Sequence, residues 1–421
     1  MQNALKNVTR RTHCRLCNSS KLELAVPMQA SPIGDHYVPA DRLTETQERY
    51  PLDLYLCMDC GHVQNIDVVD PSILFREYTY KTSHSLGLVE HYRRYAQDVT
   101  RTFEVPAGAL ALEIGSNDGS LLGFFKALGM NVLGVDPARD IAKAATERGI
   151  PTIPEFFDSR LAARMLEEHG PASIVAANNV FAHADDLADI VRGIHTMLAP
   201  NGVFVFEVSY LPDIVDRFLF DTVYHEHVSY HSIAPLSRFL DRLDMQLFNV
   251  ERIDSKGGSI RAFAQRKNEG VRPVADVVSS MIEDELRRGF DQLELYKNYT
   301  AQIEQRKIAL NALLADARVQ GKTVAGYGAS TTVTTLLWQF DLADQLAFLA
   351  DDNPAKDGLF APHCHIPVLG SEVLYSRKPD YVVILAWVYA EPIMKRHQRF
   401  LDEGGKFVIP LPELRVVSVS L

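Results

Sequence analysis

The sequence lacks the features that mark membrane proteins, secreted proteins and general nucleic-acid binders. No apolar run approaches the ~20 residues of a membrane-spanning helix, and the first residues lack the apolar core of a signal peptide. Basic residues are not in excess, because 43 Lys and Arg face 54 Asp and Glu, for a net charge of −11. We therefore expect a cytoplasmic protein that binds neither a membrane nor nucleic acid.

Cysteine is scarce, with five residues in 421. Four of the five form two C-x-x-C pairs, Cys14 with Cys17 and Cys57 with Cys60. In a reducing compartment such pairs indicate a metal site rather than disulfides, and a redox role fits less well because no βαβ pattern surrounds them. Two pairs can supply the four thiolates of a tetrahedral zinc site with no open position. We expect residues 1–72 to form a small module with a structural zinc ion.

The rest of the chain alternates short apolar strands with amphipathic helices, which is typical of parallel, doubly wound α/β sheets. One series of strands and helices begins at residues 109–114, and a second begins at residues 323–327. A long, charged helical region, residues 275–318, lies between them. The sequence therefore predicts one α/β domain at 73–300 and a second at 301–421.

The first strand of the first series runs into a glycine turn with the spacing E-x-G-x-x-x-G. Glycines let the backbone approach a ligand closely, and Asp136, at the end of the next strand, can accept ribose hydroxyls. The turn is acidic through Glu113 and Asp118, which suits a cation better than a pyrophosphate. We therefore favour S-adenosylmethionine over a dinucleotide. Asn179 and His183 follow the fourth strand and are expected to point into the same crevice.

The densest chemical stretch is residues 220–231, F-D-T-V-Y-H-E-H-V-S-Y-H. Its histidines at 225 and 227 lack the i, i+4 spacing of a helical metal site. A histidine beside a carboxylate such as Glu226 can be held in one tautomer and take a proton near neutral pH. We interpret the stretch as an acid–base cluster, with a polar loop as the alternative. The aromatic segment 75–85 is either a lid over this cluster or a solvated loop.

The second α/β series has its own glycine turn, G-Y-G-A-S at residues 326–330, which can receive a phosphate. Taken alone, the series is consistent with an NAD(P) domain that has Asp351 or Asp352 on the ribose. The third glycine of the dinucleotide fingerprint is absent, however. The two α/β domains are alternatively expected to hold a methyl donor and a nucleotide-bearing substrate.

In this order, the parts resemble the nucleotide-sugar C-3′-methyltransferases, which act on 4-keto-6-deoxy sugars. The resemblance covers nearly the whole chain. It rests on the four-cysteine module and on the strings E-I-G-S-N-D-G-S-L-L (113–122), N-N-V-F-A-H (178–183), Y-H-E-H-V-S-Y (224–230), G-Y-G-A-S (326–330) and D-D-N-P-A-K (351–356). It implies a class I S-adenosylmethionine-dependent methyltransferase domain, flanked by the zinc module and by a C-terminal Rossmann-like nucleotide-binding domain, in a monomer or weak oligomer.

The resemblance also assigns roles to residues. Those expected to hold S-adenosylmethionine are Glu113, Gly115, Asn117, Asp118, Gly119, Asp136, Asn178 and Asn179. Those expected to face the sugar are Tyr78, His183, Tyr224, Glu226 and His227, with His227 as the base. Those expected to hold the nucleotide diphosphate are Tyr327, Ser330, Asp352 and Lys356. The chain departs from the family in having Ser330-Thr331-Thr332 where relatives have a lysine and a glycine, so the resemblance does not identify the nucleotide.

The chemistry implied is C-methylation. A 4-keto group acidifies the C-3′ proton, neutral His227 removes it, and Tyr224 and His183 stabilise the enolate, which attacks the sulfonium methyl group. Three alternatives stay open at this point. They are an NAD(P)-dependent nucleotide-sugar oxidoreductase that uses the C-terminal domain, a sugar O-methyltransferase, and a non-catalytic zinc scaffold.

Overall fold

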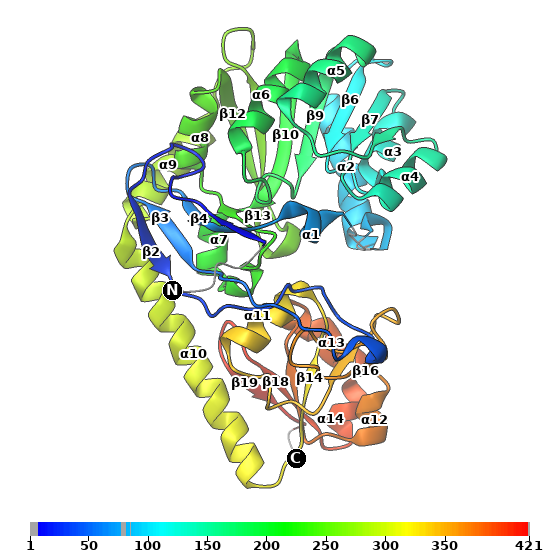
Figure 1. Cartoon of the computed structure of the whole chain (residues 1–421), viewed down its shortest axis with the longest axis vertical. Coiled ribbons are helices and arrows are strands. Elements are labelled where there is room, and N and C mark those ends of the chain that lie inside the picture. The colour runs from blue at the N-terminus through cyan, green and yellow to red at the C-terminus, as the bar shows by residue number, and fades with distance from the viewer. Residues whose placement is uncertain (1–6, 77–80, 85, 420–421) are drawn as a thin grey trace.

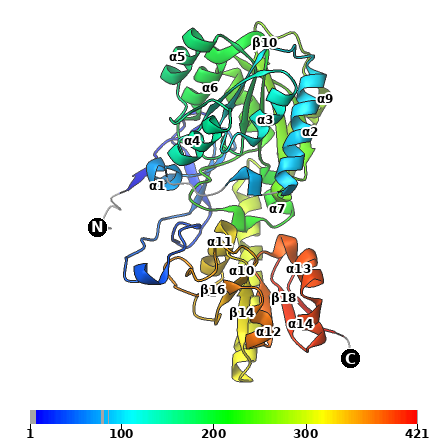
Figure 2. The same ribbon diagram turned by 90° about the vertical axis from the view of Figure 1, so that its right-hand side faces the viewer.

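The computed structural model describes residues 7–76, 81–84 and 86–419. Two α/β domains lie one above the other and are joined by the long helix α10 (Leu293–Val319), which runs along one side of the molecule (Figure 1). A turn of the view by 90° shows the N-terminal module beside both of them (Figure 2). None of the helices in the described ranges combines the length and apolar character that would let it cross a membrane.

The N-terminal module contains a small sheet, which is completed by a strand of the central domain. Its elements are β1 (Val8–Arg10), β2 (Leu22–Val26), η1 (Ala40–Arg42), β3 (Leu54–Cys57), β4 (Val63–Asn65), β5 (Asp67–Val69) and α1 (Pro71–Phe75). The sheet order is β11-β4-β3-β2, and β11 (Ser229–Tyr230) comes from the stretch that the sequence marks as catalytic. The module also reaches the C-terminal domain, where Val38 pairs with Phe360.

The central domain is built on a seven-stranded sheet in the order β12-β13-β10-β9-β6-β7-β8. All strands are parallel except β13, which runs antiparallel to both neighbours. This confirms the predicted class I methyltransferase fold. The elements are η2 (Thr82–His84), α2 (Leu86–Thr102), β6 (Leu110–Ile114), α3 (Ser120–Ala127), β7 (Asn131–Val135), α4 (Arg139–Glu147), β8 (Thr152–Ile153), α5 (Ser159–His169), β9 (Ala172–Asn178), α6 (Leu187–Met197), β10 (Leu198–Ser209), α7 (Leu211–Asp216), η3 (Phe220–Thr222), α8 (Ile233–Asp241), β12 (Met245–Ile253), η4 (Ser255–Gly257), β13 (Ser259–Arg266) and α9 (Asp276–Arg288).

The strands of this sheet are apolar on both faces because helices cover both. In β10, Val203 and Val205 pack toward α2 and α3, whereas Phe204 and Phe206 pack toward α5, α6 and α8. Successive side chains of a strand point to opposite faces, so a run without alternation is what a sheet buried on both sides requires.

The C-terminal domain repeats the architecture with a six-stranded sheet, β16-β15-β14-β17-β18-β19, parallel apart from β19. Its elements after α10 are β14 (Val324–Tyr327), α11 (Thr331–Gln339), β15 (Leu349–Asp351), β16 (Val368–Gly370), α12 (Val373–Arg377), β17 (Tyr381–Ile384), η5 (Trp387–Tyr389), α13 (Ala390–Arg396), α14 (Gln398–Asp402), β18 (Lys406–Ile409) and β19 (Arg415–Val417).

In both α/β domains an aspartate stabilises the glycine turn by a hydrogen bond to its backbone. In the central domain, Asp136 Oδ2 accepts a hydrogen bond of 2.8 Å from the Asn117 backbone N–H. In the C-terminal domain, Asp351 Oδ2 accepts one of 2.7 Å from the Ala329 N–H. In both, the carboxylate at the end of the second strand holds the turn that follows the first strand.

Helix α10 contacts both α/β domains. Near its start, the Tyr299 hydroxyl donates to the Ile214 carbonyl at 3.1 Å, and near its middle Arg306 Nε donates to the Pro412 carbonyl at 2.6 Å. The helix spans 27 residues. The boundary predicted at residue 300 therefore falls inside a continuous helix that packs on both domains.

Candidate active site

The four predicted metal ligands converge at one end of the N-terminal module. Their Sγ atoms all lie within 4.8 Å of one another. The Cys14 and Cys60 sulfurs are 3.7 Å apart, and the Cys17 and Cys57 sulfurs are 3.4 Å apart. Sulfurs around a tetrahedral zinc ion at about 2.3 Å are separated by about 3.8 Å, so the geometry and the four-thiolate donor set fit zinc.

The two C-x-x-C turns have the same backbone geometry. The Asn18 N–H donates to the Cys14 carbonyl at 2.9 Å, and the Gly61 N–H donates to the Cys57 carbonyl at 2.8 Å. Asn18 and Gly61 both have left-handed φ angles, 61° and 79°, which Asn and Gly tolerate best. Each turn thus closes on itself and presents its two sulfurs to the same side.

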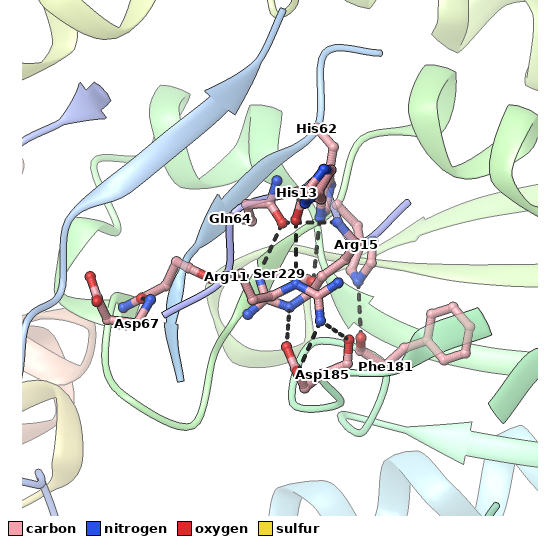
Figure 3. A network of polar contacts seen from close by, with 11 residues as sticks. Arg11, His13, Arg15, His62, Gln64, Asp67, Phe181, Asp185 and Ser229 are labelled. Atoms are coloured by element: carbon pink, nitrogen blue, oxygen red, sulfur yellow. Dashed lines mark hydrogen bonds and ion pairs between the residues drawn. The ribbon is translucent and has the colours of Figure 1, made fainter. Parts of the chain in front are cut away.

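A buried polar network ties these turns to the central domain (Figure 3). Arg15, between the first two cysteines, contacts Asp185 Oδ1 through Nε at 3.0 Å and Gln64 Oε1 through Nη1 at 3.0 Å. Arg11 reaches the other oxygen of Asp185 at 3.0 Å. Because Arg15 is buried, its pKa falls to about 10, and it stays charged beside Asp185. The cysteine module therefore holds the segment that carries His183.

The same network reaches the stretch that follows the acid–base cluster. His62, two residues after the last cysteine, shares a hydrogen bond of 3.3 Å with Ser229 Oγ. The neighbouring His231 donates from Nε2 to the Phe181 carbonyl at 3.1 Å. Both segments that carry predicted catalytic residues are thus fastened to each other and to the module (Figure 3).

The first cavity, of about 370 Å³, opens at the carboxyl ends of β6, β7 and β9. Its lining includes six of the eight residues expected to hold the methyl donor, namely Glu113, Gly115, Asn117, Asp136, Asn178 and Asn179. A Cβ atom on Gly115 would lie 2.3 Å from Val180 Cγ2. The glycine is therefore needed for the turn to pass this close to the strand end.

Several polar atoms in this cavity are not satisfied by the protein. Glu113 Oε2 and Asn178 Nδ2 are buried without a hydrogen-bond partner among the described residues. Burial, with the charges of Asp136 and Asp118 added to it, raises the pKa of Glu113 well above its usual range. Buried polar groups are normally paired. A ligand with hydroxyl and amino groups and a positive charge would supply the missing partners.

Asp118 and Gly119, the other two expected donor contacts, do not line the cavity. Asp118 Oδ1 accepts from the Ser120 hydroxyl at 2.6 Å, and its Oδ2 accepts from the Ser83 N–H at 2.9 Å. Asn117 Oδ1 likewise accepts from the Thr82 N–H at 3.0 Å. The turn therefore anchors the start of α3 and the segment 82–84, which closes one side of the cavity.

The predicted base, His227, is held in one tautomer. Its Nδ1–H donates to the Thr222 carbonyl at 2.8 Å, so Nε2 carries the lone pair, which accepts from the Tyr224 hydroxyl at 3.0 Å. Burial lowers the pKa of His227 to about 3, so the imidazole is neutral at neutral pH. The sequence interpretation was wrong on this point, because a backbone carbonyl rather than a carboxylate fixes the tautomer and the pKa is far from neutral.

His183 lies between His227 and the first cavity. Its ring is 5.0 Å from that of His227, centroid to centroid, and it stacks on Phe75 at 5.6 Å with an angle of 11°. Its Nε2 is buried and has no hydrogen-bond partner in the described part of the chain. Burial lowers the pKa of His183 most, and the neighbouring His227 and Lys256 side chains lower it further, since a second positive charge beside them is unfavourable. A neutral imidazole with an unused nitrogen thus borders the first cavity.

A second cavity, of about 590 Å³, lies between the N-terminal module and the acid–base stretch. Glu226 lines it, together with Tyr37, Tyr50 and the basic side chains Arg42 and Arg76. Tyr224, His227 and His183 are in contact, and with Glu226 they form one cluster that borders both cavities. His183 lines the first cavity and Glu226 lines the second.

The residues expected to hold the nucleotide are spread over the edge of the C-terminal sheet and do not line the second cavity. Tyr327 is buried, and its hydroxyl bonds His397 Nε2 at 2.9 Å. Ser330 caps α11, and Asp352 pairs with Arg396. Lys356 comes nearest to the cavity.

Lys356 contacts two residues of the cavity wall. Its Nζ lies 2.7 Å from Asp35 Oδ1 and 4.3 Å from the centroid of the Tyr37 ring. Tyr78, expected to face the sugar, lies outside the described residues. His225, two residues before the proposed base, instead donates from Nε2 to the Tyr50 carbonyl at 3.1 Å.

Sequence reasoning missed several residues of the site. Lys256 lines the first cavity from the turn between β12 and β13, where it adopts a left-handed φ of 52°. Phe156, Phe157 and Asp158 close the cavity after β8. The string S-K-G-G could have indicated Lys256, because its glycines mark a tight turn. Residues other than glycine that adopt a left-handed φ in such turns often lie at functional sites.

Comparisons with known proteins agree with this architecture. Three family models match consecutive parts of the chain: “Putative zinc binding domain” at residues 14–75, “Methyltransferase domain” at 88–249 and “C-methyltransferase C-terminal domain” at 254–412.

Two curated relatives and a solved structure show how far the similarity extends. C-methyltransferase NovU from Streptomyces niveus is 32% identical over 410 residues, which cover 97% of each chain. An uncharacterised methyltransferase from Bacillus pumilus is 31% identical over 128 residues, 30% of this chain and 58% of that protein. The magnesium protoporphyrin IX methyltransferase of Synechocystis PCC 6803 is 14% identical, with a TM-score of 0.32, over 42% of this chain and 81% of the other.

Proposed function

Because this chain belongs to the C-methyltransferase family, as its motifs predict, we propose that it methylates C-3′ of a nucleotide-linked 4-keto-6-deoxy sugar, with S-adenosylmethionine as the donor. Family membership removes the reason to favour the oxidoreductase, the O-methyltransferase and the scaffold. What supports the finer proposal is a single observation. One cluster of neutral histidines, a tyrosine and a glutamate borders both a cavity suited to the methyl donor and a second, larger cavity.

The first cavity suits S-adenosylmethionine by shape and charge. Asp136 can accept ribose hydroxyls, because each of its oxygens already takes one backbone N–H, from Asn117 or Ala138, and keeps further lone-pair capacity. Glu113 and Asn178 offer the unpaired atoms described above. When bound, the sulfonium supplies an electrophilic methyl group, and the acidic wall of the cavity favours its positive charge.

His227 is proposed to remove the C-3′ proton. Once the Tyr224 hydroxyl turns from Nε2 to the C-4′ oxygen, the freed Nε2 lone pair takes the proton. The C–H electron pair forms the C-3′–C-4′ double bond, and the charge moves to the C-4′ oxygen. The new imidazolium and the enolate are opposite charges in a water-poor site, so each offsets the cost of burying the other. The enolate carbon then forms a bond to the methyl carbon while the C-4′ carbonyl is restored and the sulfur leaves as a thioether.

The enolate oxygen needs positioned donors. The Tyr224 hydroxyl is 3.0 Å from His227 Nε2. The Nε2 of the neighbouring His183 has no hydrogen-bond partner among the described residues. Lys256 adds an ammonium group at the wall of the first cavity. Removing one such donor typically lowers the rate by about 10²–10³-fold. Glu226, on the second cavity, is proposed to hold a sugar hydroxyl.

The second cavity is proposed to take the substrate. Arg76 on its wall can pair with a diphosphate. Arg42, on the same wall, already pairs with both carboxylate oxygens of Glu45. Lys356 remains the strongest of the four residues expected to contact the nucleotide, since it touches two wall residues. The cysteine site is proposed to hold a structural zinc ion that fixes Arg15 and, through it, the segment of His183.

The test is a panel of thymidine, guanosine and cytidine diphosphate 4-keto-6-deoxy sugars incubated with the protein and S-adenosylmethionine. We expect one of them to gain a single CH₂ by mass spectrometry, with S-adenosylhomocysteine formed in equal amount. Absence of turnover across the panel would overturn the proposed substrate class.

A further inference from the structure

The catalytic stretch rests on the C-terminal domain. Trp387 Nε1 donates to Asp221 Oδ2 at 2.9 Å, and the Thr335 hydroxyl donates to the Val223 carbonyl at 3.0 Å. Trp387 lies in η5 and Thr335 in α11, so the two bonds come from different parts of that domain. All four residues are buried.

A ring contact continues this attachment. Phe220 stacks on Phe340, which follows α11, with 5.3 Å between centroids and an angle of 23°. The segment 220–223 is therefore fixed to the C-terminal domain by three contacts, a ring stack and two hydrogen bonds. Segments held this way lose little further entropy when a ligand binds.

The residue between the two hydrogen-bonded positions is the one that orients the base. Asp221 and Val223 flank Thr222, whose carbonyl accepts the proton of His227 Nδ1 at 2.8 Å. A shift of this peptide would turn the imidazole or release its tautomer. A displacement of about 1 Å at a reacting group can cost about 10²-fold in rate.

We infer that the C-terminal domain positions the catalytic base: Trp387 and Thr335 hold residues 221–223 so that the Thr222 carbonyl keeps His227 Nε2 aimed at the substrate. This rests on the proposed role of His227 as the base. Trp387 and Thr335 are positioning residues, since they act through the Thr222 peptide. The domain is thereby part of the proton-transfer machinery in addition to any nucleotide that it binds.

The free-energy cost of burying the Asp221 carboxyl group supports a positioning role for the contact between Asp221 and Trp387. Asp221 is 3% exposed, its Oδ1 has no hydrogen-bond partner within the described residues, and burial raises its pKa to about 7. A carboxyl group buried with half of its capacity unused destabilises a fold. Such groups persist where they fix a geometry that function requires.

The chain offers a matched control, because it has only two tryptophans. Trp338 lies on α11 with its ring against His363, and its Nε1 has no hydrogen-bond partner in the described ranges. Trp387→Phe removes an indole N–H that donates to Asp221, whereas Trp338→Phe makes the same chemical change without losing such a bond. Thr335→Val and Thr335→Ser form a second matched pair, since only serine keeps the hydroxyl.

The experiment measures two rates and one affinity for each variant. The rates are deuterium wash-in at C-3′ of the 4-keto substrate in D₂O and methyl transfer, and the affinity is that for S-adenosylmethionine by calorimetry. We expect Trp387→Phe and Thr335→Val to lower wash-in and kcat together by about tenfold or more, with donor affinity and substrate KM within about twofold. Trp338→Phe and Thr335→Ser should match the wild type.

Wash-in by Trp387→Phe and Thr335→Val at the rate of Trp338→Phe would overturn the inference, and so would a loss that appears only in donor affinity. If Trp387→Phe does not fold, the Thr335 pair decides between these outcomes. A wild type that exchanges no deuterium with any 4-keto substrate would instead contradict the proposed function, so the two failures are distinguishable.

Discussion

The imidazole rings of His183 and His227 lie 5.0 Å apart, centroid to centroid, inside a cluster that borders both cavities. Both side chains are partly buried, and this burial is the main cause that lowers the pKa of each. Two neutral imidazoles side by side can serve different purposes, one accepting a carbon-bound proton and the other donating to the oxygen where charge develops. The proposed roles in proton removal and charge stabilisation therefore fall to two neighbouring rings, of which His227 is also hydrogen-bonded to Tyr224.

Replacement of the base should separate proton removal from donor binding. In His227→Asn the side chain can still bond Thr222 but cannot take a proton at neutral pH, so deuterium wash-in at C-3′ should fall by at least about 10²-fold. Affinity for S-adenosylmethionine should stay unchanged, because His227 does not line the first cavity. Wash-in at the wild-type rate would remove His227 from the role of base.

Lys256→Met should slow the reaction through charge. The ammonium borders the first cavity and lies close enough to lower the pKa of both histidines, after burial. Loss of this cation should lower kcat by about tenfold or more, and Lys256→Arg should restore much of the rate. Lys267→Met, which breaks only an exposed ion pair with Asp241, is the control. Equal rates for the Lys256 and Lys267 variants would contradict a role for Lys256.

Gly115→Ala should abolish donor binding for a steric reason. The added Cβ would lie 2.3 Å from Val180, in a backbone with φ of 68°. Gly108→Ala places the same methyl group in the same left-handed region, at φ of 80°, with no atom within 4 Å. Both variants carry a backbone strain of about 1–2 kcal/mol, but only Gly115→Ala should lose S-adenosylmethionine in a calorimetric titration. Similar affinities in the two would separate this turn from donor binding.

Removal of zinc should loosen the module. We expect one zinc ion per chain by elemental analysis. A chelator or Cys17→Ser should lower the unfolding temperature, because zinc binding by four thiolates stabilises a module that is too small for a large hydrophobic core. Cys364→Ser, which changes the one cysteine outside the site, should leave both quantities unchanged. A metal-free protein that unfolds at the same temperature as the metal-loaded one would contradict the assignment.

The buried histidines should make the protein sensitive to acid. Burial lowers the pKa of His231 to about 4, from about 6.5 in the unfolded chain. Below pH 6.5 the unfolded state therefore binds more protons than the folded state. The contribution of neutral His231 to the free energy of unfolding is fully present above pH 6.5 and is lost as the pH falls through about 4. The loss for one such histidine is about 3 kcal/mol.

Denaturant titrations at pH 7 and pH 4 test this prediction. The free energy of unfolding of His231→Asn should fall less between the two pH values than that of the wild type. His169→Asn, at an exposed helix end, should behave as the wild type does. An equal fall in His231→Asn would contradict the account of His231.

Local sequence patterns were sufficient for the fold and for the proximity of most residues that are proposed to hold the donor. Glu113, Gly115 and Asn117 lie within five residues, and Asp136 follows one helix later, so their proximity is a property of one βαβ unit. The two C-x-x-C pairs were equally readable, because each is a single turn.

Contacts between distant segments could not be predicted. Arg15 meets Asp185 across 170 positions, and Trp387 meets Asp221 across 166. Nothing near Ser229 or Tyr230 indicates that they complete the sheet of the cysteine module. The expected carboxylate partner of the histidine was wrong for another reason, because the group that fixes the His227 tautomer is the carbonyl of Thr222, and any residue could supply a carbonyl there.

The most direct test of C-methylation uses S-adenosylmethionine with a ¹³C-labelled methyl group and the accepted nucleotide 4-keto-6-deoxy sugar. The account predicts a product whose labelled methyl is bonded to C-3′, seen by NMR as a carbon–carbon coupling and as the loss of the C-3′ proton. A label bonded to oxygen, or a C-3′ proton that survives in the methylated product, would contradict it.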